Sequence, residues 1–297
     1  CAAAVNPCSA EDLARADVAG MPGGRLVIAQ RSEPRSLNPL TAVDASSAEV
    51  IHRLMADLVH INRASLKTEP ALATRWSVSP DGLRYRLHLR RGVRFSDGHP
   101  FDADDVIFSF QAYLDERVHA PQRDLLVVNG QPVRIRKVDA YTVEVALARP
   151  YAAAERLFDG FAILPRHLLE KRWREGTLAT AWSLRTAPRE MAGLGPFRVK
   201  EAVPGQRIVL ERNPYYWKAD RTGRRLPYLD ELVFVAAGSE DAQVLRFESG
   251  ETSLLNRISA RNFELLKRSA ARRGTRTLSL GPGLEFNFLF FNLNADL

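Results

Sequence analysis

The sequence predicts a mixed α/β fold, in which short strands and amphipathic helices alternate along 297 residues. Two patterns predict it. Polar and apolar residues alternate over 84–90, which is typical of a strand with one buried face. Apolar residues recur every three or four positions over 46–60, which is typical of a helix. With 45% hydrophobic residues, the chain can bury a sizeable core in more than one domain.

The first 45 residues predict a leader, a strand and an irregular connection. Residues 1–24 are small and polar and predict a tether, and residues 25–30 predict a short buried strand. In the segment 32–39, Pro34 and Pro39 break regular strand pairing. Taken alone, this segment is an ordinary strand-to-helix connection. The predicted helix over 46–60 follows it.

The stretch 70–110 predicts a turn, a strand, a second turn and a capped helix. Residues 79–82, Ser-Pro-Asp-Gly, have turn chemistry. The strand over 84–90 then places Tyr85, Leu87 and Leu89 on one buried face. After the second turn, Asp102 stands at a helix N-cap position, and Asp105 lies three positions later, near the positive end of the helix dipole.

The remaining elements are predicted in the same way. They are a charged loop over 115–131, a hairpin of 132–138 and 141–147, a helix opening at Pro165, a hairpin of 197–200 and 206–212, a strand over 232–235, a short helix capped by Ser239 that ends before Gly250, and an apolar strand over 284–291. Before the second hairpin, Gly193 and Gly195 allow close backbone approach. Because proline and a strand follow them, a dinucleotide-binding loop is excluded.

Charge and motif content argue against nucleic-acid binding and against catalysis. The net charge of +7 comes from arginine, but 35 acidic residues are interleaved with the basic ones along the chain. Arg84, Arg86 and Arg90 share a polar strand face, which favours a solvated surface over a phosphate track. No GxSxG, HExxH, Walker A or SxxK motif occurs. The carboxylates of Asp102, Asp104 and Asp105 suit a cation, but helix capping explains them without a metal. We therefore expect no metal or cofactor.

The stretch 70–106 resembles the signature of family 5 extracellular solute-binding proteins, the peptide/nickel class of ABC-transporter receptors. The twenty matching positions are Pro70, Ala71, Leu72, Ala73, Trp76, Asp81, Gly82, Leu89, Arg90, Gly92, Val93, Phe95, Ser96, Asp97, Gly98, Pro100, Phe101, Asp104, Asp105 and Val106. The segment Glu33 to Pro39 is similar to the family's "EP.tLnP" loop, and Gly193 to Phe197 to its "GtGPy" segment.

The resemblance implies a periplasmic-binding-protein type II-like lobe with an inserted smaller α+β domain. The implied divisions are a leader or tether at 1–24, a discontinuous lobe I made of 25–45 and 190–270, an inserted variable domain at 46–189, and the start of a truncated lobe II at 271–297. Most of the second lobe would therefore be missing from these residues.

The resemblance also implies a function and a site. It predicts an extracytoplasmic solute receptor that holds a peptide between two lobes and delivers it to an inner-membrane ABC permease. Ser32, Glu33, Pro34 and Arg35 would lie at the cleft mouth, and Gly193, Gly195 and Pro196 would shape its floor. Open alternatives are another solute such as a nickel complex, haem or an oligosaccharide, a hydrolase on the same scaffold, and a scaffold or regulatory protein that binds a partner.

The two cysteines, Cys1 and Cys8, both lie in the predicted leader. A chain that begins with cysteine is typical of a bacterial lipoprotein after signal-peptide cleavage, in which Cys1 carries the lipid anchor. The alternative is an arbitrary start point. The first reading predicts a monomeric periplasmic or cell-surface lipoprotein, attached to the membrane surface through more than one acyl chain.

Overall fold

A computed structural model describes residues 14–18, 20–62, 65–255, 258–273 and 275. The chain forms two compact units, residues 1–255 and 256–297. All strands and the first four helices of the described part belong to the first unit. The second unit contributes helix α5 (Ala260–Arg273).

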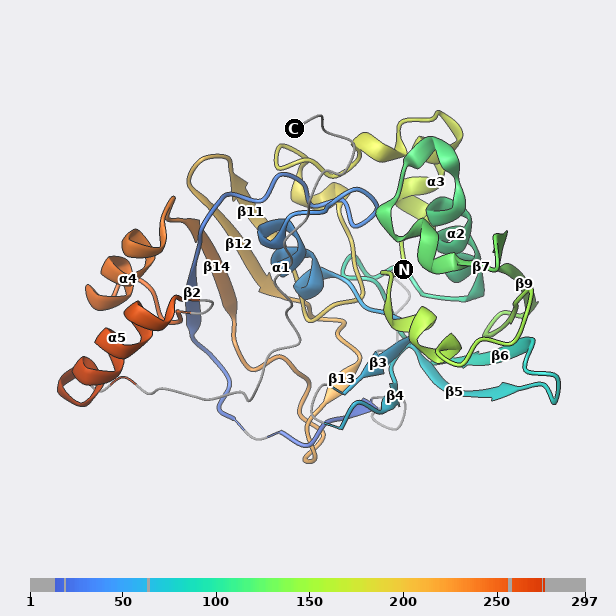
Figure 1. The fold of residues 1–297 in the computed structure, drawn as a ribbon, viewed down its shortest axis with the longest axis horizontal. Coiled ribbons are helices and arrows are strands. Elements are labelled where there is room, and N and C mark those ends of the chain that lie inside the picture. The colour runs from blue at the N-terminus through green and yellow to red at the C-terminus, as the bar shows by residue number, and fades with distance from the viewer. Residues whose placement is uncertain (1–13, 19, 63–64, 256–257, 274, 276–297) are drawn as a thin grey trace, which may run out of the picture. The chain divides into compact units, whose positions relative to one another are not determined.

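The first sheet joins the beginning of the chain to a segment near residue 200. Its strands, in spatial order, are β11 (Phe197–Val203), β12 (Arg207–Arg212), β14 (Glu231–Ala236) and β2 (Arg25–Gln30) (Figure 1). Strands β11, β12 and β14 pair antiparallel, whereas β14 and β2 pair parallel, with Glu231 opposite Arg25. The predicted strands at 25–30 and 232–235 are confirmed. The hairpin predicted from 197–200 and 206–212 is confirmed as β11 and β12.

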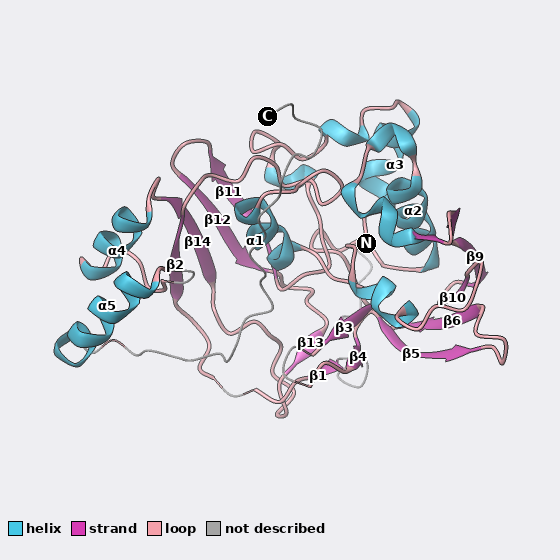
Figure 2. Cartoon of the chain, viewed as in Figure 1, coloured by secondary structure: helices cyan, strands magenta, loops and turns pink. Residues whose placement is uncertain are grey.

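The second sheet is antiparallel and lies wholly within residues 73–146. Its order is β5 (Ala73–Val78), β6 (Arg84–Leu89), β10 (Thr142–Ala146) and β9 (Arg134–Asp139) (Figure 2). The predicted alternation in β6 is confirmed, because Tyr85, Leu87 and Leu89 are buried while Arg84 and Arg86 are exposed. The turn at 79–82 joins β5 to β6, with a hydrogen bond of 2.8 Å from the Gly82 amide to the Ser79 carbonyl.

The described residues also form three short two-stranded pairs. They are β1 (Ala14–Arg15) with β13 (Lys218–Ala219), β3 (Val59–Ile61) with β4 (Thr68–Pro70), and β7 (Val127–Val128) with β8 (Gln131–Pro132). The first pair engages part of the predicted tether, since Ala14 and Arg15 fall within residues 1–24. The boundaries of the predicted lobes stay predictions.

The described part of the first unit contains four α-helices: α1 (Ala45–Leu54), α2 (Ala103–Leu114), α3 (Arg166–Arg174) and α4 (Glu240–Glu248). Short 3₁₀ helices span Glu116–Val118, Pro121–Leu126, Ala154–Asp159, Leu178–Thr180 and Pro188–Glu190. The predicted caps are confirmed. Asp102 and Asp105 form a reciprocal capping box on α2, and Ser239 caps α4.

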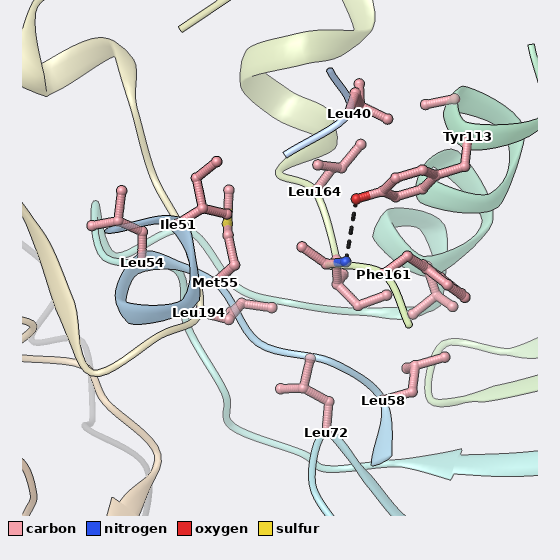
Figure 3. Packing of buried hydrophobic residues seen from close by; sticks show 14 of the residues in the cluster. Leu40, Ile51, Leu54, Met55, Leu58, Leu72, Tyr113, Phe161, Leu164 and Leu194 are labelled. Atoms are coloured by element: carbon pink, nitrogen blue, oxygen red, sulfur yellow. Dashed lines mark hydrogen bonds between the residues drawn. The ribbon is translucent and has the colours of Figure 1, made fainter. Parts of the chain in front are cut away.

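One hydrophobic core cluster contains residues from both sheets and from α1 and α2. Figure 3 shows part of it, with Leu54 of α1 and the following residue, Met55, beside Leu194, and with the Tyr113 side chain of α2 directed toward the segment at Phe161. The fully buried Tyr113 hydroxyl accepts a hydrogen bond of 3.2 Å from the Ala162 amide. A buried hydroxyl that finds a partner avoids the cost of desolvation without a hydrogen bond.

The prediction of a helix over 46–60 is wrong in its second half. Helix α1 ends at Leu54, and Val59–Ile61 form a strand. The backbone carbonyls that a longer helix would use internally accept bonds from distant segments instead. The Leu54, Ala56 and Leu58 carbonyls accept from the amides of Gly195, Ile163 and Ala73, at 2.8, 3.0 and 2.8 Å. Tertiary hydrogen bonds thus override the helical spacing of the apolar side chains.

The prediction of a loop over 115–131 is also wrong, because two 3₁₀ helices and strand β7 lie there. The helix predicted to open at Pro165 is confirmed as α3. The predicted strand over 284–291 lies outside the described residues.

Candidate functional site

The segment that follows edge strand β2 presents backbone groups without protein partners. Ser32 is exposed and Glu33 is half-buried. Within the described residues, neither the N–H nor the C=O group of these two residues makes a hydrogen bond to the protein. Exposed, unpaired backbone at the end of an edge strand can pair with another extended chain.

Hydroxyl groups at the start of α1 hold this segment in place. The Ser47 hydroxyl accepts hydrogen bonds from the amides of Arg35 and Ser36, at 2.9 and 3.2 Å. It donates in turn to the carboxylate of Asp44, the N-cap of α1, at 2.7 Å. The Ser32 and Ser46 hydroxyls lie 3.0 Å apart. Sequence reasoning missed both helix serines, although an aspartate followed by two serines at a helix start was the available signal.

The four predicted mouth residues do not share one role. The Glu33 carboxylate accepts a hydrogen bond of 2.6 Å from the amide of Gly205, in the turn between β11 and β12. Pro34 is buried, so its ring packs inside the protein, whereas Arg35 is exposed. Glu33 and Pro34 therefore anchor the segment, and the exposed groups left for a ligand are the Ser32 and Glu33 backbone and the Arg35 side chain.

The predicted floor residues are packed against the other end of α1. A Cβ atom placed on Gly193 would lie 1.9 Å from the Leu54 carbonyl oxygen, and one on Gly195 would lie 2.5 Å from the Leu54 carbonyl carbon. The predicted close backbone approach is confirmed. Gly193 and Gly195 are buried, and the Pro196 carbonyl accepts a hydrogen bond of 2.9 Å from the Asn213 amide. Beside Gly193 lies a cavity of about 10 Å³, room for about one water molecule.

The two groups of predicted site residues lie at opposite ends of one helix. Ser46 and Ser47 at the start of α1 hold the 32–36 segment, and Leu54 at its end contacts Gly193 and Gly195. Ten helical residues span about 15 Å. Helix α1 therefore fixes the position of the mouth segment, residues 32–36, relative to the glycine turn, residues 193–196. The two groups do not contact each other.

The three aspartates that could suit a cation, Asp102, Asp104 and Asp105, take part in helix capping and in an ion pair. Asp102 and Asp105 accept backbone amides, and Asp104 pairs with Lys137 at 2.8 Å. Across the described part of the chain, no group of three or more His, Cys, Asp or Glu residues is arranged to hold a metal ion. Nor does any helix there have both the length and the apolar character needed to cross a membrane.

Comparison with known proteins decides the family. The model of the bacterial extracellular solute-binding proteins, family 5, matches residues 67–297. The chain belongs to this family. The matched range contains the second sheet, the glycine turn and three strands of the first sheet.

Curated relatives of this family member carry names for several solutes. The periplasmic alpha-galactoside-binding protein of Rhizobium meliloti is 31% identical over 249 residues, which cover 81% of this chain and 36% of the relative. The dipeptide-binding protein of Escherichia coli is 26% identical, over 90% of this chain and 50% of the relative. The chain thus spans about half or less of the length of these relatives.

Solved structures share the fold. The oligopeptide-binding protein AppA of Bacillus subtilis, in complex with a nonapeptide, has a TM-score of 0.70 at 25% identity, over 84% of this chain and 46% of that one. The binding protein DppA of Helicobacter pylori, in complex with the peptide STSA, has a TM-score of 0.69 at 26% identity, over 84% and 49%. The predicted type II periplasmic-binding-protein architecture is therefore confirmed, and partial coverage agrees with the expectation that much of a second lobe is missing.

Proposed function

We propose that this family member is the part of an extracytoplasmic ABC-import receptor that supplies one wall of a peptide-binding cleft. The observation that carries the proposal is the unpaired Ser32 and Glu33 backbone at the end of edge strand β2. An extended peptide would pair with these N–H and C=O groups irrespective of its side chains. The peptide complexes of AppA and DppA support this ligand class.

The finer parts of the proposal rest on family membership. Ligand capture would close two lobes about a hinge, and the closed form would be recognised by a membrane permease. The receptor would act as a monomer, and the Cys1 thiol would carry its lipid anchor. Arg35 would add a charged contact at the cleft mouth, and the turn of Gly193, Gly195 and Pro196 would support the cleft from the far end of α1.

A matched pair of variants tests the main-chain contact. Both Ser32→Pro and Ser32→Ala remove the hydroxyl, but only Ser32→Pro also removes the backbone N–H. Peptide binding to the 297-residue chain is measured by native mass spectrometry and calorimetry with a defined mixture of short peptides. We expect Ser32→Pro to weaken binding about three- to tenfold relative to Ser32→Ala, the value of one hydrogen bond.

Two outcomes would contradict this proposal. If the two variants have equal affinities and equal thermal midpoints, the Ser32 amide does not bind the peptide. An α-galactoside found as an added mass that disappears on denaturation would show that the ligand is a sugar and not a peptide. It would then be the solute named for the Rhizobium meliloti relative.

A further inference from the structure

A second concave site lies on the polar face of the second sheet, apart from the segment after β2. It is a hollow of about 360 Å³, within the range of small-ligand sites. Its lining residues include Thr74, Arg75, His88, Arg90, Arg91 and Thr142. Three arginines therefore line one hollow. Arg75 lies near the start of β5, and Arg90 and Arg91 directly follow β6.

Strand register places three of the lining residues side by side. Arg75 of β5 and Thr142 of β10 both lie opposite His88 of β6, so the three residues form one row across the sheet. The register shifts on both sides of that row, between Ala73 and Arg75 and again after Thr142. Such bulges redirect side chains and interrupt the ladder, and they recur beside functional sites.

Aromatic rings hold two of the three guanidinium groups. The Arg91 guanidinium carbon lies 4.4 Å from the centre of the Tyr141 ring, and that of Arg90 lies 5.4 Å from the Trp217 ring. The Arg90 Nε also donates to the Ala71 carbonyl at 3.3 Å. Stacking and hydrogen bonding restrict these long side chains, which lowers the entropy lost when a ligand binds.

Within the described part of the chain, the row of Arg75, His88 and Thr142 lacks the ion pairs of the neighbouring row on the same face, which contains Arg86 and Glu144. There, Glu144 pairs with Arg86 and Arg136 at 3.0 and 2.7 Å. At the edge of the hollow, hydrogen bonds from the Tyr141 amide and the Thr142 side chain lower the pKa of Asp139, and the charge of Arg91 lowers it further. Arg75 forms no ion pair with any described residue. Nearby, burial lowers the pKa of Lys218, and the positive charge of Arg90 lowers it further.

We propose that this hollow binds a phosphate group, through Arg75, Arg90 and Arg91. The planar guanidinium fork matches phosphate oxygens in a bidentate geometry. The phosphate would come either from a soluble phosphate or phosphate ester, or from the headgroup of an anionic phospholipid. This site is separate from the peptide cleft and does not depend on that proposed function.

The test compares three arginine variants of the 297-residue chain. Arg75→Gln and Arg91→Gln remove charge from the hollow, whereas Arg84→Gln removes the same charge from an exposed position on the same face of β6. Inorganic phosphate is titrated by calorimetry in a buffer without other multivalent anions. Phosphatidylglycerol vesicles, with phosphatidylcholine vesicles as the neutral comparison, are tested by co-sedimentation. Peptide binding is measured in parallel and is expected to be unchanged.

We expect saturable binding that Arg75→Gln and Arg91→Gln weaken about tenfold or more, and that Arg84→Gln leaves within about twofold. Binding of inorganic phosphate would identify a soluble source. Binding only of phosphatidylglycerol vesicles, with the same dependence on the variants, would identify a lipid headgroup. An equal loss in all three variants would indicate general charge attraction and overturn the proposal, as would no binding of either probe by a chain with an unchanged thermal midpoint.

Discussion

Asp105 shows how a single buried carboxyl group serves the fold. Its two oxygens accept the backbone amides of Asp102 and Arg166, both at 3.1 Å, so it ties the start of α2 to the start of α3. Burial raises the pKa of Asp105 from 3.8 to about 6, although both backbone hydrogen bonds favour the ionised form. The sequence placed this residue in the first turn of a helix but gave no sign of its burial.

This raised pKa predicts a pH-dependent effect of Asp105→Asn. The folded state holds the Asp105 proton up to about pH 6, whereas the unfolded state loses it near 3.8. Between these values the folded state binds more protons, so the contribution of Asp105 to stability falls as pH rises. Denaturant unfolding at pH 4, 5, 6 and 7 is expected to show a larger destabilisation by Asp105→Asn at pH 4 than at pH 7. The same destabilisation at every pH would show that the proton on Asp105 does not distinguish the two states.

At the scale of elements, the contact between the glycine turn and the end of α1 joins two parts of the first unit. The Gly195 amide donates to the Leu54 carbonyl at 2.8 Å, and the Asn213 side-chain amide donates to the Gly195 carbonyl at the same distance. The carbonyl at the end of α1 is thus satisfied by a segment 141 positions further along the chain. This contact explains both the end of the helix and the need for glycine.

Gly195→Ala is expected to destabilise the protein by about 3 kcal/mol, because its Cβ would meet backbone atoms of Arg53, Leu54 and Met55 at 2.5–2.7 Å. Gly205→Ala is the matched control. Its Cβ would meet no atom within 4 Å, and only its φ of +76° is unfavourable, at a cost of about 1 kcal/mol. Denaturant unfolding measures both. Equal costs would contradict the packing role, and an unchanged stability with lost peptide binding would favour a ligand role for Gly195.

At the scale of the molecule, one core joins two sheets of different origin. The first sheet pairs residues 206 positions apart in sequence, since Arg25 of β2 lies opposite Glu231 of β14. The second sheet is built from a continuous stretch. The core cluster nevertheless includes Leu210 and Phe234 from the first sheet and Leu87 and Val145 from the second.

This shared core predicts that the two sheets unfold together. In native-state hydrogen exchange, the central strands β12 and β14 of one sheet and β6 and β10 of the other are expected to exchange with the same, highest free energy of opening. Two distinct levels, one for each sheet, would contradict this expectation. That result would instead favour the predicted division into a lobe and an inserted domain at 46–189.

Local patterns in the sequence were sufficient to predict much of the fold. Period-two alternation predicted β6, Asp102 at an N-cap position predicted the start of α2, and Ser239 predicted the start of α4. The twenty matched positions over 70–106 indicated the family, which the family model then established over 67–297. Each of these signals depends on residues a few positions apart, so the chain itself carries it.

Tertiary structure alone decided where α1 ends, which residues hold the segment 32–36 and which arginines line the hollow. Apolar residues over 54–59 suit a helix and a buried strand equally, and distant amides that bind the Leu54, Ala56 and Leu58 carbonyls select between them. The hollow depends on cross-strand register and on two bulges, which place Arg75 and Thr142 beside His88. Register and hydrogen-bond partners are set by contacts between remote segments, and no local pattern specifies them.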